Sequence, residues 1–217
     1  MAQAVNYASG PKALIFDLMG TCCDWNSSIL PALHSAPSTA ALPSEVFPQL
    51  ARDWREGFFK EAHNRYEARQ PVEDIDITHR RVLNWLLLAR KVTPAQWDEN
   101  VRTMLVQAWH SQIPWPDVVD ALERLGQKYI IKPDKAMYTK ALDLIQVSPS
   151  EAMMVAAHAY DLRAAKKVGM RTAYVQRSTE DLHEDMKAVR GEVDFFFDGS
   201  TGTEEGGFAD LAKVLGV

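Results

Sequence analysis

Strand-like and helix-like patterns alternate along the second half of the chain, and this alternation restricts the fold more than any other feature of the sequence. Helical patterns lie at 115–125, 135–145, 161–168 and 208–215, and Gly126 and Gly169 mark the expected ends of two of these helices. Short apolar runs typical of buried parallel strands lie at 129–131, 152–156, 172–175 and 193–197. The sequence therefore predicts an α/β core with a parallel sheet and right-handed crossovers.

A further apolar run near the N-terminus ends in an acidic residue. Residues 12–16 read Lys-Ala-Leu-Ile-Phe and lead directly into Asp17, which Leu-Met-Gly-Thr follows. Asp17 is then expected at the carboxyl end of a parallel strand, where ligands bind in open α/β sheets. A carboxylate held on such a turn suits nucleophilic catalysis, although an acid that merely caps the turn would give the same local pattern.

The block between these two regions is helical in pattern. Apolar residues recur at helical spacing in three stretches, at 47–58, 82–89 and 97–109, and prolines at 31, 37, 43, 71 and 94 fall between or at the starts of helical segments. The sequence thus predicts two domains. Residues 1–23 with 112–217 form the α/β core, and residues 24–111 form a helical cap inserted after the first strand. The glycine-rich stretch 199–207 is expected to be a loop.

Composition narrows the classes of function. The formal net charge is -5 and no basic block stands out, which argues against a nucleic-acid partner. No apolar stretch reaches membrane-spanning length, and the N-terminus lacks the pattern of a signal peptide. Cys22 and Cys23 are adjacent and are expected to stay reduced. We therefore expect a cytoplasmic protein without membrane contact.

Four segments together resemble motifs of the haloacid dehalogenase superfamily. Residues 16–21, Phe-Asp-Leu-Met-Gly-Thr, resemble its first motif; Lys132-Pro133-Asp134 with Tyr138 resembles the third; and residues 156–161, Ala-Ala-His-Ala-Tyr-Asp, resemble the fourth. Residues 115–118, Trp-Pro-Asp-Val, resemble the segment that re-enters the core in 2-haloacid dehalogenases. The resemblance implies a Rossmann-like core, a cap domain and an aspartate nucleophile.

The resemblance favours the metal-free dehalogenase branch over the phosphatase branch. Family phosphatases carry a second aspartate two residues after the nucleophile, which protonates the leaving alcohol. This chain has Met19 there, and a departing halide needs no proton. The fourth motif offers one acid, Asp161, for a cation that prefers several oxygen ligands. We expect no metal and no cofactor, although Asp17 with Asp161 could in principle bind Mg²⁺.

The resemblance also implies catalytic roles. Asp17 attacks C2 of a 2-haloacid, and water hydrolyses the resulting aspartyl ester to a 2-hydroxy acid. Lys132 keeps Asp17 ionised, Thr21 orients it, and Asp161 positions or activates the water; Asp161 could also be the N-cap of a helix beginning at Leu162. His158 replaces a family asparagine and either takes over water activation or only bonds a neighbouring loop.

Five further residues are substrate-binding candidates. Arg55 follows Trp54 and resembles the family arginine that holds the substrate carboxylate or the departing halide; a solvated arginine at a helix edge is equally compatible with its position. Phe59 lies one turn later and either lines the pocket or packs in the core. Met19, Tyr138 and Tyr160 accompany the motifs. The expected partner is a small anionic substrate, and a homodimer remains open.

One family segment is missing from the sequence. The second motif, a strand ending in serine or threonine followed by Asn-Gly and a crossover helix, belongs between Ile131 and Lys132, which are adjacent here. That Ser/Thr holds the substrate's anionic group. Either residues there went unrecorded or the chain truly lacks the block. If the junction is continuous, residues 129–131 should lie at the sheet edge, and the dehalogenase should be weak or inactive. The alternatives are thus an impaired, truncated protein or a family phosphatase.

Overall fold

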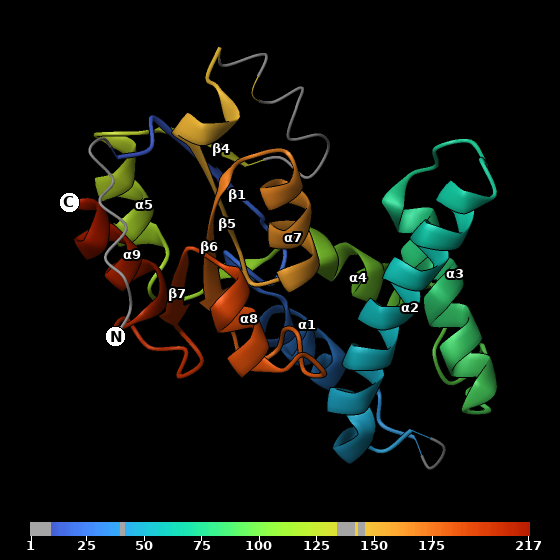
Figure 1. Ribbon diagram of the computed structural model, residues 1–217. Helices are drawn as coiled ribbons and strands as arrows, with labels where there is room; N and C mark the ends of the chain where they lie inside the picture. Colours follow the sequence, from blue (N-terminus) through green and yellow to red (C-terminus); the bar gives the residue numbers. More distant parts are fainter. Residues whose placement is uncertain (1–9, 40–41, 134–141, 143–145) are drawn as a thin grey trace. The chain divides into compact units, whose positions relative to one another are not determined.

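The chain folds into two compact units in the computed structural model, which describes residues 10–39, 42–133, 142 and 146–217 (Figure 1). The core unit comprises Met1–Asp24 with Pro114–Val217, and the helical unit, named the cap unit after the expectation from the sequence, comprises Trp25–Ile113. The expected boundaries differ from these by one residue at the first crossing and two at the second. Two short strands, β2 (Cys23–Asp24) and β3 (Ile113–Pro114), pair where the chain passes between the units.

A parallel sheet forms the centre of the core unit. In the described part of the chain its strand order is β4-β1-β5-β6-β7, and every adjacent pair is parallel. The strands are β1 (Ala13–Phe16), β4 (Ile130–Pro133), β5 (Ala152–Ala156), β6 (Arg171–Gln176) and β7 (Phe195–Asp198). Strands β1 and β5 are entirely buried, as their unbroken apolar sequences require. The predicted parallel α/β core is confirmed.

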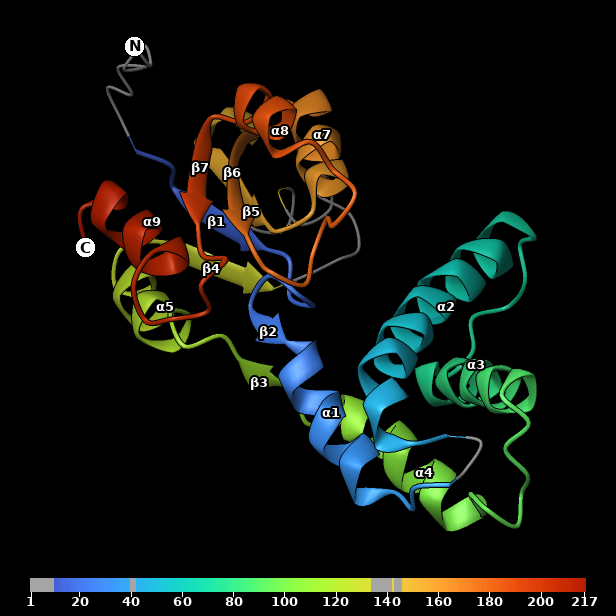
Figure 2. The same ribbon diagram turned by 90° about the horizontal axis from the view of Figure 1, so that it is seen from below.

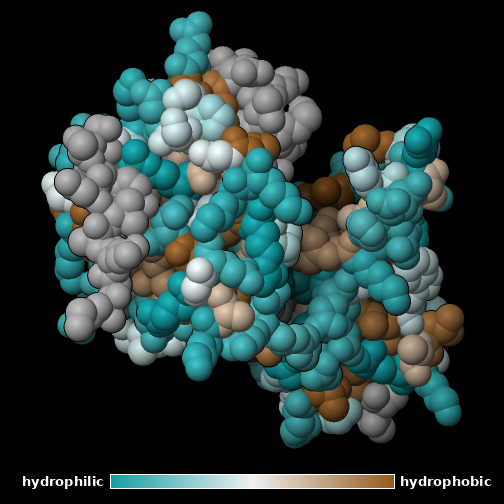
Figure 3. All heavy atoms as spheres, in the orientation of Figure 1, coloured by the Kyte–Doolittle hydropathy of each residue, from teal (hydrophilic) through white to brown (hydrophobic). Residues whose placement is uncertain are grey.

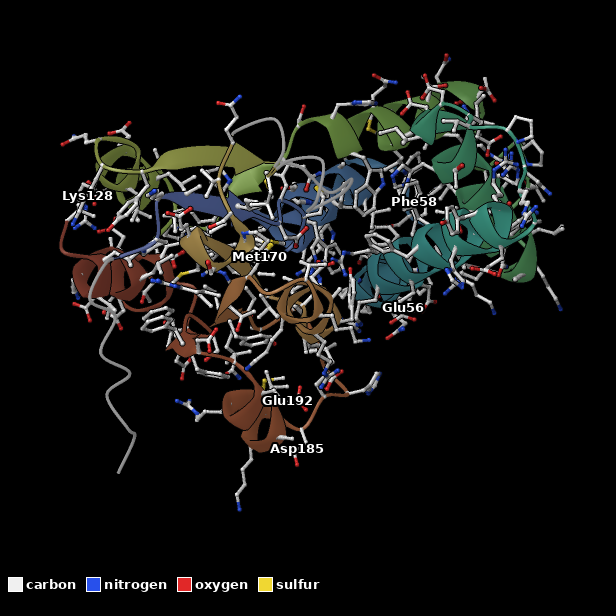
Figure 4. The ribbon with its side chains drawn as sticks, turned by 45° about the horizontal axis from the view of Figure 1, so that its top comes forward. Glu56, Phe58, Lys128, Met170, Asp185 and Glu192 are labelled. Atoms are coloured by element: carbon white, nitrogen blue, oxygen red, sulfur yellow. The ribbon has the colours of Figure 1, made fainter. Side chains whose placement is uncertain are left out.

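Helices cover both faces of this sheet (Figure 2). Successive side chains of a strand point to opposite faces. Leu14 and Phe16 therefore pack with α5 (Val119–Gly126) and α9 (Gly207–Leu215), whereas Ala13 and Ile15 share a cluster with residues of α7 (Ala159–Lys167) and α8 (Met186–Glu192). Asp185 and Glu192 mark the two ends of α8 on the outside of the core unit (Figure 4).

The cap unit is helical, as its sequence pattern predicts. Its helices are α1 (Trp25–Ser35), α2 (Phe47–Glu67), α3 (Ile75–Ala89) and α4 (Glu99–Gln107), with short 3₁₀ turns at Ser44–Val46 and Ala108–His110. Asp74 and Asp98 begin α3 and α4 by accepting backbone N–H bonds. Their apolar faces meet at fully buried residues, among them Leu50, Ala51, Trp54, Leu83, Leu87 and Trp97.

Several predicted boundaries were wrong. Gly126 is the last residue of α5 rather than a residue beyond it. Pro31 lies inside α1, where burial of Trp25, Ile29 and Leu33 along one face outweighs the helix-breaking cost of about 3 kcal/mol. The pattern also missed α1 and α8 as separate helices. The expected helix at 135–145 falls almost wholly outside the described residues.

The junction at Ile131–Lys132 is continuous. Both residues are successive members of β4, and their Cα partners in β1 are Leu14 and Ile15. The sequence predicted a strand over 129–131, but the strand extends through Pro133. A proline is tolerated there because β4 is the edge strand of the described sheet. The expected edge position of residues 129–131 is therefore confirmed for the strand residues 130 and 131.

The surface is mainly hydrophilic on the faces visible in Figure 3, with hydrophobic residues scattered among polar ones. Within the residues that the structure describes, no helix is both long and apolar enough to cross a membrane. Cys22 and Cys23 are free thiols, as predicted.

Candidate active site

Asp17 lies one residue beyond β1, at the carboxyl edge of the sheet. Its backbone N–H donates to the carbonyl of Val155 in β5 at 3.0 Å, which continues the strand pairing by one bond. The side chain is almost completely buried. A carboxylate in this position is fixed by the sheet and lies where ligands bind in parallel α/β folds.

Two donors converge on the same oxygen of Asp17. The Thr21 hydroxyl donates to Oδ2 at 2.7 Å, and His158 Nδ1 lies 2.9 Å from Oδ2. Thr21 Oγ1 in turn accepts the backbone N–H of Ala157 at 2.8 Å, which directs the hydroxyl hydrogen toward Asp17. The two oxygens of this carboxylate are therefore chemically distinct before any substrate arrives.

His158 bridges two buried carboxylates. Its Nδ1 faces Asp17, and its Nε2 lies 2.7 Å from Oε2 of Glu180. A carboxylate only accepts hydrogen bonds, so this geometry calls for a proton on both ring nitrogens. Burial is the largest single influence and lowers the pKa of His158, but the bonds to Asp17 and Glu180 together outweigh it and raise that pKa to about 9. His158 is thus a proton donor at neutral pH.

The loop after β6 supplies the second carboxylate. Glu180 is buried, accepts the Thr179 hydroxyl at Oε1, and lies against Gly20 of the nucleophile loop. Gly20 has φ +89°, and a Cβ there would lie 2.4 Å from the Glu180 carboxyl carbon, so only glycine fits. Sequence reasoning missed Glu180. Its position shortly after a parallel strand, at the same sheet edge as Asp17, was the available signal.

A buried ion pair between Arg177 and Asp117 contacts the loop that follows Asp17. Arg177 Nε donates to the carbonyl of Thr21 at 3.1 Å, and its Nη1 contacts Asp117 at 2.9 Å. Asp117 also accepts the backbone N–H of Phe208 at the start of α9. Trp115 adds two bonds, from Nε1 to the carbonyl of Gly20 and from its backbone N–H to Cys22. The predicted re-entry segment therefore fixes the turn that carries Asp17.

The other core residues predicted from the fourth motif lie around His158. Asp161 is in the first turn of α7, with Oδ2 3.9 Å from His158 Nδ1. It is not an N-cap, because α7 begins at Ala159 rather than at Leu162. The exposed ring of Tyr160 lies 5.3 Å from the His158 ring. These residues form one cluster with Asp17.

For three other predicted site residues, the structure gives only their burial or backbone position, or does not describe them. Met19 is half-buried, two residues beyond Asp17. Lys132 has its backbone in β4, opposite Ile15 of β1. Tyr138 lies outside the described residues.

In the cap unit, Arg55 packs against two aromatic rings. Its guanidinium carbon lies 4.9 Å from the centre of the Trp25 ring and 5.1 Å from that of Phe59. Arg55 and Phe59 are both half-buried. Contact with two aromatic faces restrains the guanidinium orientation and contributes about 0.5–1 kcal/mol for each ring.

One group of described side chains has the spacing of a metal site: Asp17, His158 and Asp161 offer ligand atoms within 4.8 Å of one another. The chemistry of the group does not fit a cation. His158 directs each ring nitrogen at a carboxylate and has no lone pair to give, and its positive charge at neutral pH opposes a second cation beside it. The site as built is a carboxylate paired with an imidazolium.

Comparison with known proteins agrees with this geometry. The family model described as haloacid dehalogenase-like hydrolase matches residues 117–175. Among solved structures, the L-2-haloacid dehalogenase PA0810 is 26% identical, with a TM-score of 0.73 over 95% of this chain and 99% of that one. The chain therefore resembles haloacid dehalogenase-like hydrolases in part of its sequence and in its fold. No curated protein matches the chain.

More distant structures share the fold over nearly the whole chain. A defluorinating L-2-haloacid dehalogenase is 21% identical, with a TM-score of 0.71 over 95% of this chain and 96% of that one. The L-2-haloacid dehalogenase from Xanthobacter autotrophicus with chloropropionic acid covalently bound is 16% identical, with a TM-score of 0.67 over 94% and 98%. The family model spans His158 and Asp161 but ends before Glu180, and it begins after Asp17.

Proposed function

We propose that this chain hydrolyses the carbon–halogen bond of a small 2-haloacid and releases a 2-hydroxy acid. One observation carries the proposal: Asp17 Oδ2 accepts from Thr21 and lies beside His158 Nδ1, and we therefore propose Oδ1 as the attacking oxygen. A carboxylate held in this way is an oriented nucleophile at a sheet edge. The family resemblance and the 26% identity to an L-2-haloacid dehalogenase over almost the whole chain add support.

In the first step, Asp17 Oδ1 forms a bond to C2 of the substrate. The carbon–halogen bond breaks, halide departs with the electron pair, and an ester joins Oδ1 of Asp17 to C2 of the acid. The nucleophile carries its negative charge into this step, so no base is needed. Halide also leaves without a proton, which fits Met19 at the position where a phosphatase has its acid.

In the second step, water adds to Cγ of Asp17 and loses a proton to a base, for which Asp161 beside His158 is the candidate. The carbonyl electrons move to Oδ2, where the Thr21 hydroxyl and His158 stabilise the oxyanion. When the carbonyl re-forms, the bond between Cγ and Oδ1 breaks, and Oδ1 takes the proton held by Asp161, so that the product leaves as the hydroxy acid. The Asp17 carboxyl group keeps the oxygen of water and releases its remaining proton to solvent. The raised pKa of His158 favours this donor role over the role of base.

A second candidate is a catalytically impaired member of the same superfamily. The continuous strand β4 favours it, because the sequence passes through the junction without the second motif that holds the anionic group in family members. On our proposal the chemistry is retained and substrate binding is weak. We therefore expect a KM far above that of a complete family dehalogenase, and slow turnover.

The experiment is a halide-release assay on the verified 217-residue chain. The purified protein is incubated with chloroacetate and each enantiomer of 2-chloropropionate, and chloride and hydroxy acid are measured together. Slow, equimolar formation of both products supports the proposal. Absence of halide in a folded sample supports the impaired alternative, and turnover of a phosphate monoester would favour the phosphatase reading.

Chelation is expected to leave any halide release unchanged. The donor cluster includes an imidazolium whose nitrogens both face carboxylates, so it has no capacity for Mg²⁺. Activity is compared with and without EDTA, and then with added Mg²⁺. A requirement for the metal would contradict this reading of His158 and return the chain to the phosphatase branch.

Replacement of Arg55 is expected to raise KM for 2-chloropropionate. We propose that its guanidinium binds the substrate carboxylate, and truncation removes a charged bond of about 1.5–3 kcal/mol, or roughly ten- to a hundredfold in affinity. Arg55→Lys should rescue only partly, because an ammonium lacks the bidentate fork. Arg52→Ala, on the same helix and bonded to Gln49, is the matched control. Equal kinetics in Arg55→Ala and in the control would show that Arg55 only packs.

A further inference from the structure

We propose that Glu180 is a positioning residue for hydrolysis of the aspartyl ester, holding His158 so that its Nδ1–H points at Asp17 Oδ2. The inference rests on the proposed function for its catalytic consequence. Its structural part, a carboxylate–imidazole–carboxylate chain that joins two loops, stands on geometry alone. Glu180 lies outside the segment that the family model matches.

Glu180 is a buried acid with specific hydrogen-bond contacts, unlike an acid on the surface. Oε2 lies 2.7 Å from His158 Nε2, Oε1 accepts the Thr179 hydroxyl at 3.0 Å, and the side chain is almost fully buried. Its carboxyl group occupies the space that any side chain at position 20 would need. The nucleophile loop and the loop after β6 are therefore packed around this carboxylate.

The contact with Glu180 sets the orientation of the His158 ring relative to Asp17. With Nε2–H bonded to Glu180, the ring orientation is fixed and Nδ1 is aimed at Oδ2 at 2.9 Å. Burial of an imidazolium is costly and lowers its pKa, and a second buried carboxylate offsets this cost. Without Glu180, the ring would lose both its orientation and part of the charge that keeps Nδ1 protonated.

The other groups that face His158 do not replace this one. Among the described residues, the other acids near His158 are Asp17, Asp161 and Asp181. Asp17 lies just after β1, and Asp161 Oδ2 lies 3.9 Å from His158 Nδ1. Asp181 accepts the backbone N–H of Ala159 at the start of α7. Tyr160 contributes only its ring. Glu180 is the described acid that lies within hydrogen-bond distance of Nε2.

The consequence for chemistry appears after halide has left. Ester formation removes the negative charge of Asp17, and Oδ2 becomes the ester carbonyl oxygen. Glu180 is then the carboxylate that still lies within hydrogen-bond distance of His158, and it favours the protonated ring while water attacks. Loss of one donor to a developing oxyanion slows reactions by about 10²–10³-fold, so hydrolysis, rather than halide departure, should suffer most in a Glu180 variant.

The test compares Glu180→Gln with Glu184→Gln, a matched control whose carboxylate pairs with Arg163 near the surface. The first readout is the pKa of His158, measured by imidazole NMR in the absence of substrate. We expect a value near 9 in the parent chain and in the control, and a clear fall in Glu180→Gln. The second readout is single-turnover kinetics with 2-chloropropionate, in which chloride and ester-modified protein are followed by intact mass.

For Glu180→Gln we expect a burst of up to one chloride per chain, accumulation of the ester, and hydrolysis slowed by about 10²-fold. The decline of hydrolysis at alkaline pH should begin at lower pH than in the parent chain, since the donor form of His158 is lost as pH rises through its pKa. Circular dichroism checks folding. If Glu180→Gln does not fold, Glu180→Asp retains the charge at a shorter reach, and an intermediate pKa of His158 is expected.

An unchanged pKa of His158 in a folded Glu180→Gln protein overturns the inference, whatever the activity. The same holds if chloride release and ester hydrolysis slow by equal factors. If the parent chain releases no halide at all, the proposed function fails, while the NMR comparison still decides whether Glu180 sets the state of His158.

Discussion

Asp17→Asn is expected to abolish halide release while leaving the fold intact. The amide is neutral and a poor nucleophile, and loss of a catalytic nucleophile costs about 10⁴-fold or more. The fold should survive because the amide has the size of the carboxylate, and its oxygen can still accept from Thr21 and His158. The backbone N–H of residue 17 also keeps its bond to Val155.

Chloride release from 2-chloropropionate and the unfolding midpoint are measured together for this variant. Asp210→Asn, which alters an exposed acid paired with Lys213 in α9, serves as the control and should match the parent chain in both. If freshly prepared Asp17→Asn turns over within a few-fold of the parent chain, the covalent mechanism is wrong, since no other described carboxylate lies at the carboxyl end of β1.

Arg177→Leu is expected to destabilise the core unit more than any surface substitution. The guanidinium is completely buried against Asp117, lies over the rings of Trp115 and Phe208, and donates to the carbonyl of Thr21. Removing one partner of a buried pair leaves an uncompensated charge and costs about 3–5 kcal/mol. For a chain of this size, that corresponds to a fall in Tm of about 6–20 °C.

Arg163→Leu is the matched control for this prediction. Arg163 forms two ion pairs, with Glu184 and Glu192, but its side chain is 39% exposed, and exposed pairs contribute about 0–1 kcal/mol each. The double variant Arg177→Leu with Asp117→Leu removes both charges and should recover part of the loss. A melting temperature in Arg177→Leu equal to that of the Arg163 control would show that the buried pair does not hold the loop.

The sequence alone determined the class of the core and the position of its nucleophile candidate. Short unbroken apolar runs at 13–16 and 152–156 favour strands buried on both faces, and parallel strands place their carboxyl ends together. That rule placed Asp17 at the carboxyl edge of the sheet, whereas Thr21, His158 and Asp161 were added to the site by the resemblance to family motifs. Helical spacing likewise separated the cap from the core, because period and composition are local properties of a chain.

Tertiary structure decided what the local pattern does not encode. The pairing of His158 with Glu180, and of Arg177 with Asp117, joins residues 22 and 60 positions apart, so only the packing of loops against one another creates them. The same packing turns His158 from a candidate base into a donor, because two buried carboxylates overcome the cost of burying its charge. It also carries β4 through Pro133 as an edge strand, where a missing N–H costs little.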